Sequence, residues 1–186
     1  MNLRIIGGRL RGKKLYSAPG THTRPTADRV REAIFNILNT EVVGTKVLDM
    51  FAGTGCFGLE ALSRGAERAV FIDNHRLPVS VIKKNIAACR FDAVARIHKC
   101  DFRYDANRLS IIGNGFDLVF MDPPYNQGLV ESTLVLLGTK ELLKKEAIVI
   151  VEHTSLEPIG ESIKPFVVED QRKYGKTLVS FLRYTI

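Results

Sequence analysis

The sequence predicts an α/β fold with a mostly parallel seven-stranded sheet. Short apolar runs alternate with segments of helical periodicity, which is typical of parallel strands joined by helices. Two of the runs end in an acidic residue followed by a tight loop, the arrangement of a ligand-binding sheet edge. Near the end of the chain, two strand-like segments with a short turn predict an antiparallel C-terminal hairpin.

The elements of the core follow from the positions of these runs. Strands are expected near residues 46–50, 69–73, 94–98, 116–121 and 147–151. Helices are expected near residues 57–64, 77–89, 103–111 and 128–137. Because strands and helices alternate, the sheet should be parallel and covered on both faces. Residues 165–173 and 177–185 should form the antiparallel hairpin, joined at Tyr174-Gly175-Lys176.

A small extension precedes this core. Residues 3–6 and 9–16 flank Gly7-Gly8, a favourable turn for a β-hairpin. A helix should follow Arg24-Pro25, with Thr26 as its N-cap, because apolar residues recur at helical spacing at Val30, Ala33, Ile34, Ile37 and Leu38. The chain is therefore expected to form one domain over 1–186, with the extension at 1–40 and the core at 41–186.

The composition excludes several classes of protein. At 186 residues with 45% apolar and 25% charged residues, the chain suits one compact domain. No apolar run approaches the roughly 18 residues of a membrane span, and the N-terminal apolar stretch is too short for a signal peptide. The three cysteines form no CxxC pair, which fits a reducing cytosol without disulfides or a zinc site. We expect a cytoplasmic protein, a monomer, without a metal.

The positive charge is concentrated at the N-terminus. The net charge is +7, and residues 1–31 alone carry eight basic residues against one acid, so the remainder is neutral. A polyanion is the natural partner of such a segment, although a simple solvated surface is the alternative. The candidate RNA-binding residues are Arg9, Arg11, Lys13, Lys14, Arg24 and Arg29.

The first strand-end loop predicts a cofactor site. Asp49 ends a strand, Gly53-x-Gly55-x-x-Gly58 follows, and Asp73 ends the next strand, placed to hold two ribose hydroxyls. This spacing also matches the dinucleotide-binding fingerprint. However, a pyrophosphate prefers a helix N-terminus without a nearby anion, whereas an anionic Asp49 suits a cationic ligand end. The pattern therefore favours S-adenosylmethionine over NAD.

The second loop predicts a pocket for a planar group that carries an amine. Asp122-Pro123-Pro124-Tyr125 directly follows the apolar run 116–121. The lone pair of a nucleobase amine is delocalised into the ring, and two acceptors at its N–H bonds favour localisation toward an incoming methyl group. The Asp122 carboxylate and the Pro123 carbonyl can be these acceptors, Pro124 further stiffens the loop, and Tyr125 can stack on the base.

These motifs resemble those of a known family. Residues 47–55 are similar to the first signature of S-adenosylmethionine-dependent methyltransferases, and residues 122–125 to the [DN]PP[YF] signature of amino-directed ones. Ile5-Ile6-Gly7-Gly8-x-x-Arg11-Gly12, Thr23-Arg24-Pro25-Thr26-x-x-Arg29-Val30-Arg31-Glu32 and Tyr174-Gly175-Lys176-Thr177 resemble the bacterial family that methylates guanine N2 in 16S ribosomal RNA, the RsmD type. The resemblance spans nearly the whole chain. It implies the Rossmann-like class I methyltransferase fold, with one methyltransferase domain over 1–186 and its Rossmann-like catalytic core at 41–186.

The resemblance implies roles for the matched positions. Gly53 and Gly55 would pass under the cofactor, Asp73 would hold its ribose, and Asp101 would accept from its adenine amine beside Phe102. On local residues alone, Asp101 could instead be a helix N-cap and Phe102 a core residue. The full set of implied cofactor contacts is Asp49, Phe51, Ala52, Gly53, Thr54, Gly55, Asp73, Asn74, Asp101, Phe102 and Asp122, with the catalytic segment Asp122, Pro123, Pro124 and Tyr125.

The identity of the base stays open between guanine and adenine. Guanine offers N1–H beside N2, which a carboxylate could accept, and this favours guanine weakly. The lack of a separate recognition domain argues for folded RNA over sequence-specific DNA. The alternatives are an adenine-N6 methyltransferase on RNA or DNA, and a non-catalytic RNA-binding or ribosome-assembly module. An intact Asp122-Pro123-Pro124-Tyr125 segment argues against the second alternative.

Overall fold

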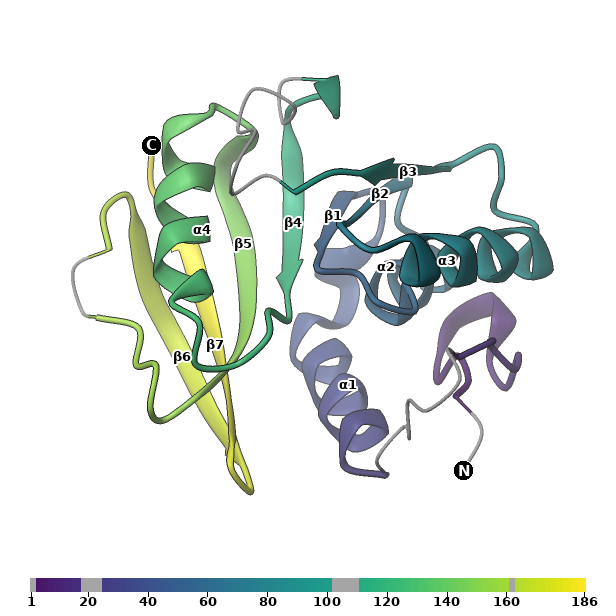
Figure 1. Cartoon of the computed structure of the whole chain (residues 1–186), viewed down its shortest axis with the longest axis horizontal. Helices are drawn as coiled ribbons and strands as arrows, with labels where there is room; N and C mark the ends of the chain where they lie inside the picture. The colour runs from purple at the N-terminus through teal and green to yellow at the C-terminus, as the bar shows by residue number, and fades with distance from the viewer. Residues whose placement is uncertain (1–2, 18–24, 102–110, 161–162) are drawn as a thin grey trace. The chain divides into compact units, whose positions relative to one another are not determined.

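The computed structural model describes residues 3–17, 25–101, 111–160 and 163–186. It divides into two compact units, Met1–Lys99 and Cys100–Ile186. Figure 1 shows the elements of each unit along the chain. Among the described residues, no helix is long and apolar enough to cross a membrane.

The first unit contains three parallel strands. Strand β1 spans Lys46–Met50, β2 spans Arg68–Asp73 and β3 spans Ala95–Lys99, in the spatial order β3-β2-β1. The helices are α1 (Pro25–Leu38), α2 (Cys56–Ser63) and α3 (Arg76–Cys89), with 3-10 turns η1 (Gly8–Leu10) and η2 (Asn39–Val42). Four of the five residues of β1 are buried, which matches a strand covered on both faces.

Helix α2 lies very close to β2, and glycine makes this possible. A Cβ atom on Gly58 would lie 2.4 Å from the Phe71 ring, a distance that the packed core could not accommodate. Phe71 itself is fully buried. The third glycine of the loop motif therefore serves helix–strand packing and brings the start of α2 against the sheet.

The N-terminal arm, residues 3–17, differs from the predicted hairpin. Backbone hydrogen bonds join Leu3 to Leu15 and Ile5 to Lys13, but the connection is a wide loop containing η1, so the two-residue turn at Gly7-Gly8 is wrong. The N–H groups of Ile6 and Gly7 donate to the buried carboxylate of Glu60 in α2, each at 2.7 Å. Cβ atoms on Gly7 or Gly8 would collide with residues 63–64, so these glycines allow the arm to approach α2.

The second unit contains a mixed sheet. Strand β4 spans Phe116–Met121, β5 spans Leu143–Thr154, β6 spans Phe166–Tyr174 and β7 spans Thr177–Tyr184, with helix α4 at Leu129–Thr139. Strands β4 and β5 are parallel, β7 is antiparallel to both β5 and β6, and the order is β4-β5-β7-β6. Gly175-Lys176 forms the predicted turn between β6 and β7.

The predicted fold class is confirmed, with seven strands in the described residues and an antiparallel hairpin at the C-terminal end. Strand β5 is longer than predicted because residues on both sides of the apolar run 147–151 also pair. Leu143 pairs with β4, and residues 152–154 pair with β7. Helix α1 begins at Pro25, so Thr26 is not its N-cap; proline suits the first position of a helix. The predicted helix at 103–111 lies almost entirely outside the described residues.

Candidate active site

The loop after β1 has an unusual backbone. Phe51, Gly53 and Gly55 have φ angles of 58°, 57° and 75°. A left-handed conformation is costly for a residue such as Phe51, and such strain concentrates at functional sites. The loop is held by the Ala52 N–H, which donates to the Ile72 carbonyl at 2.9 Å, and by the Gly55 N–H, which donates to the Ala52 carbonyl at 2.7 Å. The loop is thus a fixed turn at the carboxyl end of β1.

Asp73 joins this turn to the end of β2. One carboxylate oxygen accepts from the Gly53 N–H and the other from the His75 N–H, both at 2.9 Å. Each oxygen retains a second lone pair, so the same carboxylate can also accept from ribose hydroxyls. The structure therefore brings Gly53 and Asp73 together as expected, and the acid is oriented before any ligand arrives.

Asp49 is more deeply buried than a simple charge partner would be. The side chain is 2% exposed, and its Oδ2 accepts from the Gly58 N–H in the first turn of α2 at 2.9 Å. Burial raises the pKa of Asp49 to about 8; the Gly58 hydrogen bond opposes this rise and the nearby charge of Asp73 adds to it. Asp49 thus organises the start of α2, and its charge depends on what binds nearby.

Cys56 has a basic neighbour that the sequence did not reveal. The Arg31 guanidinium of α1 lies close to the thiol. Burial nevertheless dominates and raises the pKa of Cys56, despite the opposing effect of Arg31. A thiol whose pKa is raised is a poor nucleophile, so Arg31 does not activate Cys56 for nucleophilic attack.

The second loop follows β4 directly. Asp122 and Pro124 are exposed, Pro123 is buried, and Tyr125 is 40% exposed. The Tyr125 hydroxyl donates to Glu152 Oε1 at 2.8 Å and also hydrogen-bonds the side chain of Thr177. Burial raises the pKa of the Tyr125 phenol, and the carboxylates of Glu152 and Asp122 raise it further, so the phenol keeps its proton.

Glu152 and Thr177 were not predicted as site residues. Thr177 ends the Tyr174-Gly175-Lys176-Thr177 motif, so the β6–β7 turn brings this motif to Tyr125. Glu152 directly follows the buried run 147–151. An acid at the end of a buried strand is the same signal that identified Asp49, Asp73 and Asp122, and it could have identified Glu152.

A polar network supports the loop after Tyr125. The Glu157 carboxylate accepts from the N–H groups of Asn126 at 2.5 Å and Gly128 at 2.7 Å, next to the start of α4. His153 Nδ1 lies 2.9 Å from the Glu157 carbonyl, so it carries the proton, and Nε2 contacts the Ser180 hydroxyl at 2.8 Å. The buried His153 therefore fixes the backbone of Glu157, and the Glu157 side chain in turn holds residues 126–128.

The structure describes some of the other predicted cofactor residues and not others. Thr54 accepts from the Asn85 side-chain amide through its carbonyl at 2.9 Å, which ties the glycine loop to α3. Asn74 and Asp101 are partly exposed and both make interactions in the structure. Phe102 and Arg24 lie outside the described residues. Among the described residues, no cluster of His, Cys, Asp and Glu could hold a metal ion.

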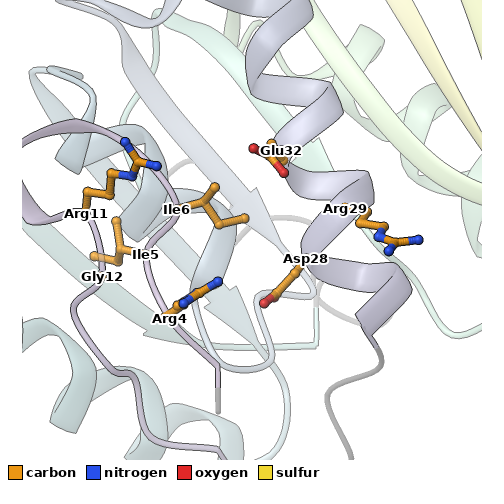
Figure 2. Close-up of a pocket in the computed structure, with 8 residues that line it drawn as sticks. All are labelled: Arg4, Ile5, Ile6, Arg11, Gly12, Asp28, Arg29 and Glu32. Carbon is orange, nitrogen blue, oxygen red and sulfur yellow. The ribbon is translucent and has the colours of Figure 1, made fainter. Parts of the chain in front are cut away.

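The predicted RNA-binding residues of the arm are all at the surface. Arg9, Arg11, Lys13 and Lys14 are exposed, and the Arg9 guanidinium lies 4.9 Å from the centre of the Phe91 ring. A pocket of about 320 Å³ lies between the arm and α1. Its lining includes Arg4 and Arg11 of the arm and Asp28, Arg29 and Glu32 of α1 (Figure 2). In this view the Arg29 guanidinium points away from the arm. Arg4 adds a basic residue that the prediction had not included.

Comparison with known proteins identifies the family of the chain. The family model described as "Conserved hypothetical protein 95" matches residues 3–183. The chain is 39% identical over 150 residues to "Ribosomal RNA small subunit methyltransferase D" of Escherichia coli K12, which covers 81% of this chain and 74% of the relative. The chain belongs to the RsmD-type family. It is also 31% identical to "Putative rRNA methyltransferase YlbH" of Bacillus subtilis, over 97% of this chain and 98% of the relative.

Solved structures of the family share the fold. A "Putative methyltransferase yhhF" from Escherichia coli is 34% identical, with a TM-score of 0.85 over 100% of this chain and 99% of the other. A "putative methylase HI0767" from Haemophilus influenzae is 27% identical, with a TM-score of 0.82 over 100% of both chains. The prediction of an RsmD-type member of the Rossmann-like methyltransferases is therefore confirmed at the level of family and fold.

Proposed function

We propose that the protein transfers a methyl group from S-adenosylmethionine to the exocyclic N2 amine of a guanine in small-subunit ribosomal RNA. The observation that carries the proposal is the Asp122-Pro123-Pro124-Tyr125 segment at the carboxyl end of β4, in a chain of this family. Asp122 and Tyr125 are exposed there, where a base can reach them. Such an enzyme would act in the cytoplasm, where ribosomal RNA is assembled.

The residues of the first unit suit this cofactor. Gly53 has a positive φ angle, and a Cβ atom there would approach only the Phe51 carbonyl, so its backbone is open to a ligand. Asp73 presents free lone pairs beside that backbone. S-adenosylmethionine supplies a methyl group that its sulfonium already activates, so the protein needs to supply alignment and electrostatics.

The residues of the second unit suit the target amine. Asp122 and the Pro123 carbonyl each accept a hydrogen bond from the two N–H groups of N2, and the lone pair of nitrogen then points at the methyl carbon. As the N–C bond forms and the C–S bond breaks, N2 becomes cationic and acidic. Its proton leaves to Asp122 or water. Tyr125 stacks on the base, a contact worth about 1–3 kcal/mol.

The decisive test is the identity of the product. The protein is incubated with labelled S-adenosylmethionine and small-subunit RNA that lacks modifications, either free or in partly assembled subunits, and the methylated nucleoside is identified by mass spectrometry. N2-methylguanosine supports the proposal. N6-methyladenosine would replace it with the adenine alternative, and no label in any RNA would favour a non-catalytic RNA-binding module.

Asp122 variants test the mechanism. Asp122→Ala should lower the single-turnover rate by at least a hundredfold with nearly unchanged cofactor affinity, because the carboxylate contacts the target amine. Asp122→Asn should be less severe, since its amide oxygen still accepts one hydrogen bond. Asp117→Ala, at the opposite end of β4, is the matched control. A wild-type rate in Asp122→Ala would remove Asp122 from the reaction.

A further inference from the structure

Two acids occupy equivalent positions where the pairing between the parallel strands β4 and β5 ends. Met121 of β4 is paired with Val151 of β5, and Asp122 and Glu152 follow directly. Residues at the same register of paired strands point to the same face of a sheet. The carboxylates of Asp122 and Glu152 both raise the pKa of the Tyr125 hydroxyl, which agrees with their lying close to the same group. Glu152 therefore lies beside the segment proposed to hold the target amine.

Glu152 is incompletely paired for a partly buried acid. Its Oε1 accepts from Tyr125, whereas no hydrogen bond or ion pair within the described parts of the chain engages Oε2. Burial raises the pKa of Glu152, and the hydrogen bond from Tyr125 opposes this rise. Withdrawing a carboxylate from water without a cationic partner has a free-energy cost. Such a group at a strand-end site is a candidate for contact with a ligand.

We propose that Glu152 is the specificity-determining residue of the target pocket and accepts a hydrogen bond from guanine N1–H through Oε2. This proposal rests on the proposed function. Guanine presents N1–H and the N2 amine side by side, so two neighbouring carboxylates match its edge, with Asp122 on N2 and Glu152 on N1. Adenine presents a lone pair at N1, which a carboxylate repels. Glu152 would thereby exclude adenine from a pocket that Asp122 and Pro123 alone would leave open to both bases.

The pairing with Tyr125 gives Glu152 a fixed orientation. Tyr125 must donate its only hydroxyl proton to Oε1, and Thr177 holds the same hydroxyl from β7. The hydrogen bond therefore links two groups of the proposed pocket. These are the Tyr125 ring, on which the base stacks, and the Glu152 carboxylate, which accepts from its N1–H. A pocket that binds an N–H group in this way rejects an analogue without it, because the buried acceptor is then left unpaired.

The test uses an analogue that keeps the amine and changes N1. Mass spectrometry of nuclease fragments of the labelled RNA locates the target guanine. RNA with 2-aminopurine at that position retains the 2-amine but has an acceptor at N1. The wild-type protein should methylate this RNA with a kcat/KM at least tenfold below that for guanine. Equal values would overturn the proposal without any variant, whereas absence of N2-methylguanosine from the guanine RNA would instead refute the proposed function.

Glu152→Gln provides the second arm. Its amide oxygen still accepts from Tyr125, and its N–H can donate to the N1 acceptor of 2-aminopurine. The ratio of kcat/KM for guanine to that for 2-aminopurine should therefore fall at least tenfold, with unchanged cofactor affinity. Glu131→Gln, an exposed acid of α4, should keep the wild-type ratio. If Glu152→Gln slows both substrates equally, Glu152 only supports Tyr125 and the proposal is wrong.

Discussion

The Asp73 carboxylate accepts a hydrogen bond from the Gly53 N–H at 2.9 Å, so the ends of β1 and β2 are joined directly. Its other oxygen accepts from the His75 N–H, just before α3. The acid that is proposed to hold the ribose therefore also shapes the glycine loop beneath the cofactor. A change at Asp73 should affect both at once.

Asp73→Ala should weaken binding of S-adenosylmethionine and of its demethylated product by at least tenfold. Hydrogen bonds to a charged group are worth about 1.5–3 kcal/mol each, and the variant also releases the Gly53 N–H. Isothermal titration calorimetry measures both affinities. Asp92→Ala, an exposed acid before β3, should bind like the wild-type protein. Unchanged affinity in Asp73→Ala would show that Asp73 only orders the loop.

Asp49 should make stability depend on pH when no cofactor is bound. Its pKa is about 8 in the folded protein, against an ordinary value of 3.8, so the folded state holds a proton that the unfolded state has released. The contribution of this proton to the free energy of unfolding is fully present below about pH 4 and is lost as the pH rises through 8. Urea unfolding should show that the wild-type protein becomes less stable by about 2 kcal/mol relative to Asp49→Asn between pH 6 and pH 8.5.

A cationic ligand should reverse this preference, because it favours the carboxylate form of Asp49. Binding of S-adenosylmethionine near pH 7 should then release close to one proton from the wild-type protein and none from Asp49→Asn. Calorimetry in buffers of different ionisation enthalpy counts these protons. Equal release from both proteins would limit Asp49 to its contact with Gly58.

The strand-end residues explain why much of the site could be predicted from the sequence. Buried parallel strands appear as continuous apolar runs, and a polar residue that ends such a run must lie at the sheet edge. Asp73 is the last residue of β2, Asp49 is the penultimate residue of β1, and Asp122 directly follows β4. Local sequence is sufficient here because the strand itself fixes where its end lies.

Contacts between distant segments could not be predicted in the same way. Gly7 and Gly8 suit a tight turn locally, yet Glu60 and Ser63 of α2 hydrogen-bond the backbone of Gly7, and Gly8 packs closely against Ser63. The proximity of Arg31 to Cys56 likewise depends on how α1 packs. Such tertiary contacts override turn propensity, and nothing within the arm itself encodes them.

Glu60 should anchor the N-terminal arm. Its side chain is fully buried and accepts from the Ile6 and Gly7 N–H groups and from Arg64 Nε, all at 2.7 Å. Glu60→Ala leaves these buried donors unpaired and should destabilise the protein by about 3 kcal/mol, with Glu60→Gln less severe. Urea unfolding measures the destabilisation, and limited proteolysis should show faster cleavage within residues 3–17. Glu67→Ala, an exposed acid of the same unit, should do neither.

Neutralising the arm should weaken RNA binding without affecting the cofactor. Arg9, Arg11, Lys13 and Lys14 are exposed, and within the described residues none of their side chains forms an ion pair, so changing all four to Gln should preserve the fold. Arg9 lies in η1 and Arg11 in the wide loop, so these residues do not alternate along one strand with Lys13. The test therefore concerns their combined charge.

If each side chain neutralises one phosphate, the slope of log K against log salt should become shallower by roughly 0.7 for each phosphate of single-stranded RNA that is no longer neutralised. Filter binding at several salt concentrations measures this slope. Changing Lys83, Lys84, Lys140 and Lys145 to Gln removes the same charge from exposed positions elsewhere and is the matched control. An equal decrease in affinity in both variants would mean that net charge alone attracts the RNA. A larger decrease in the arm variant would locate the RNA-binding surface on residues 3–17.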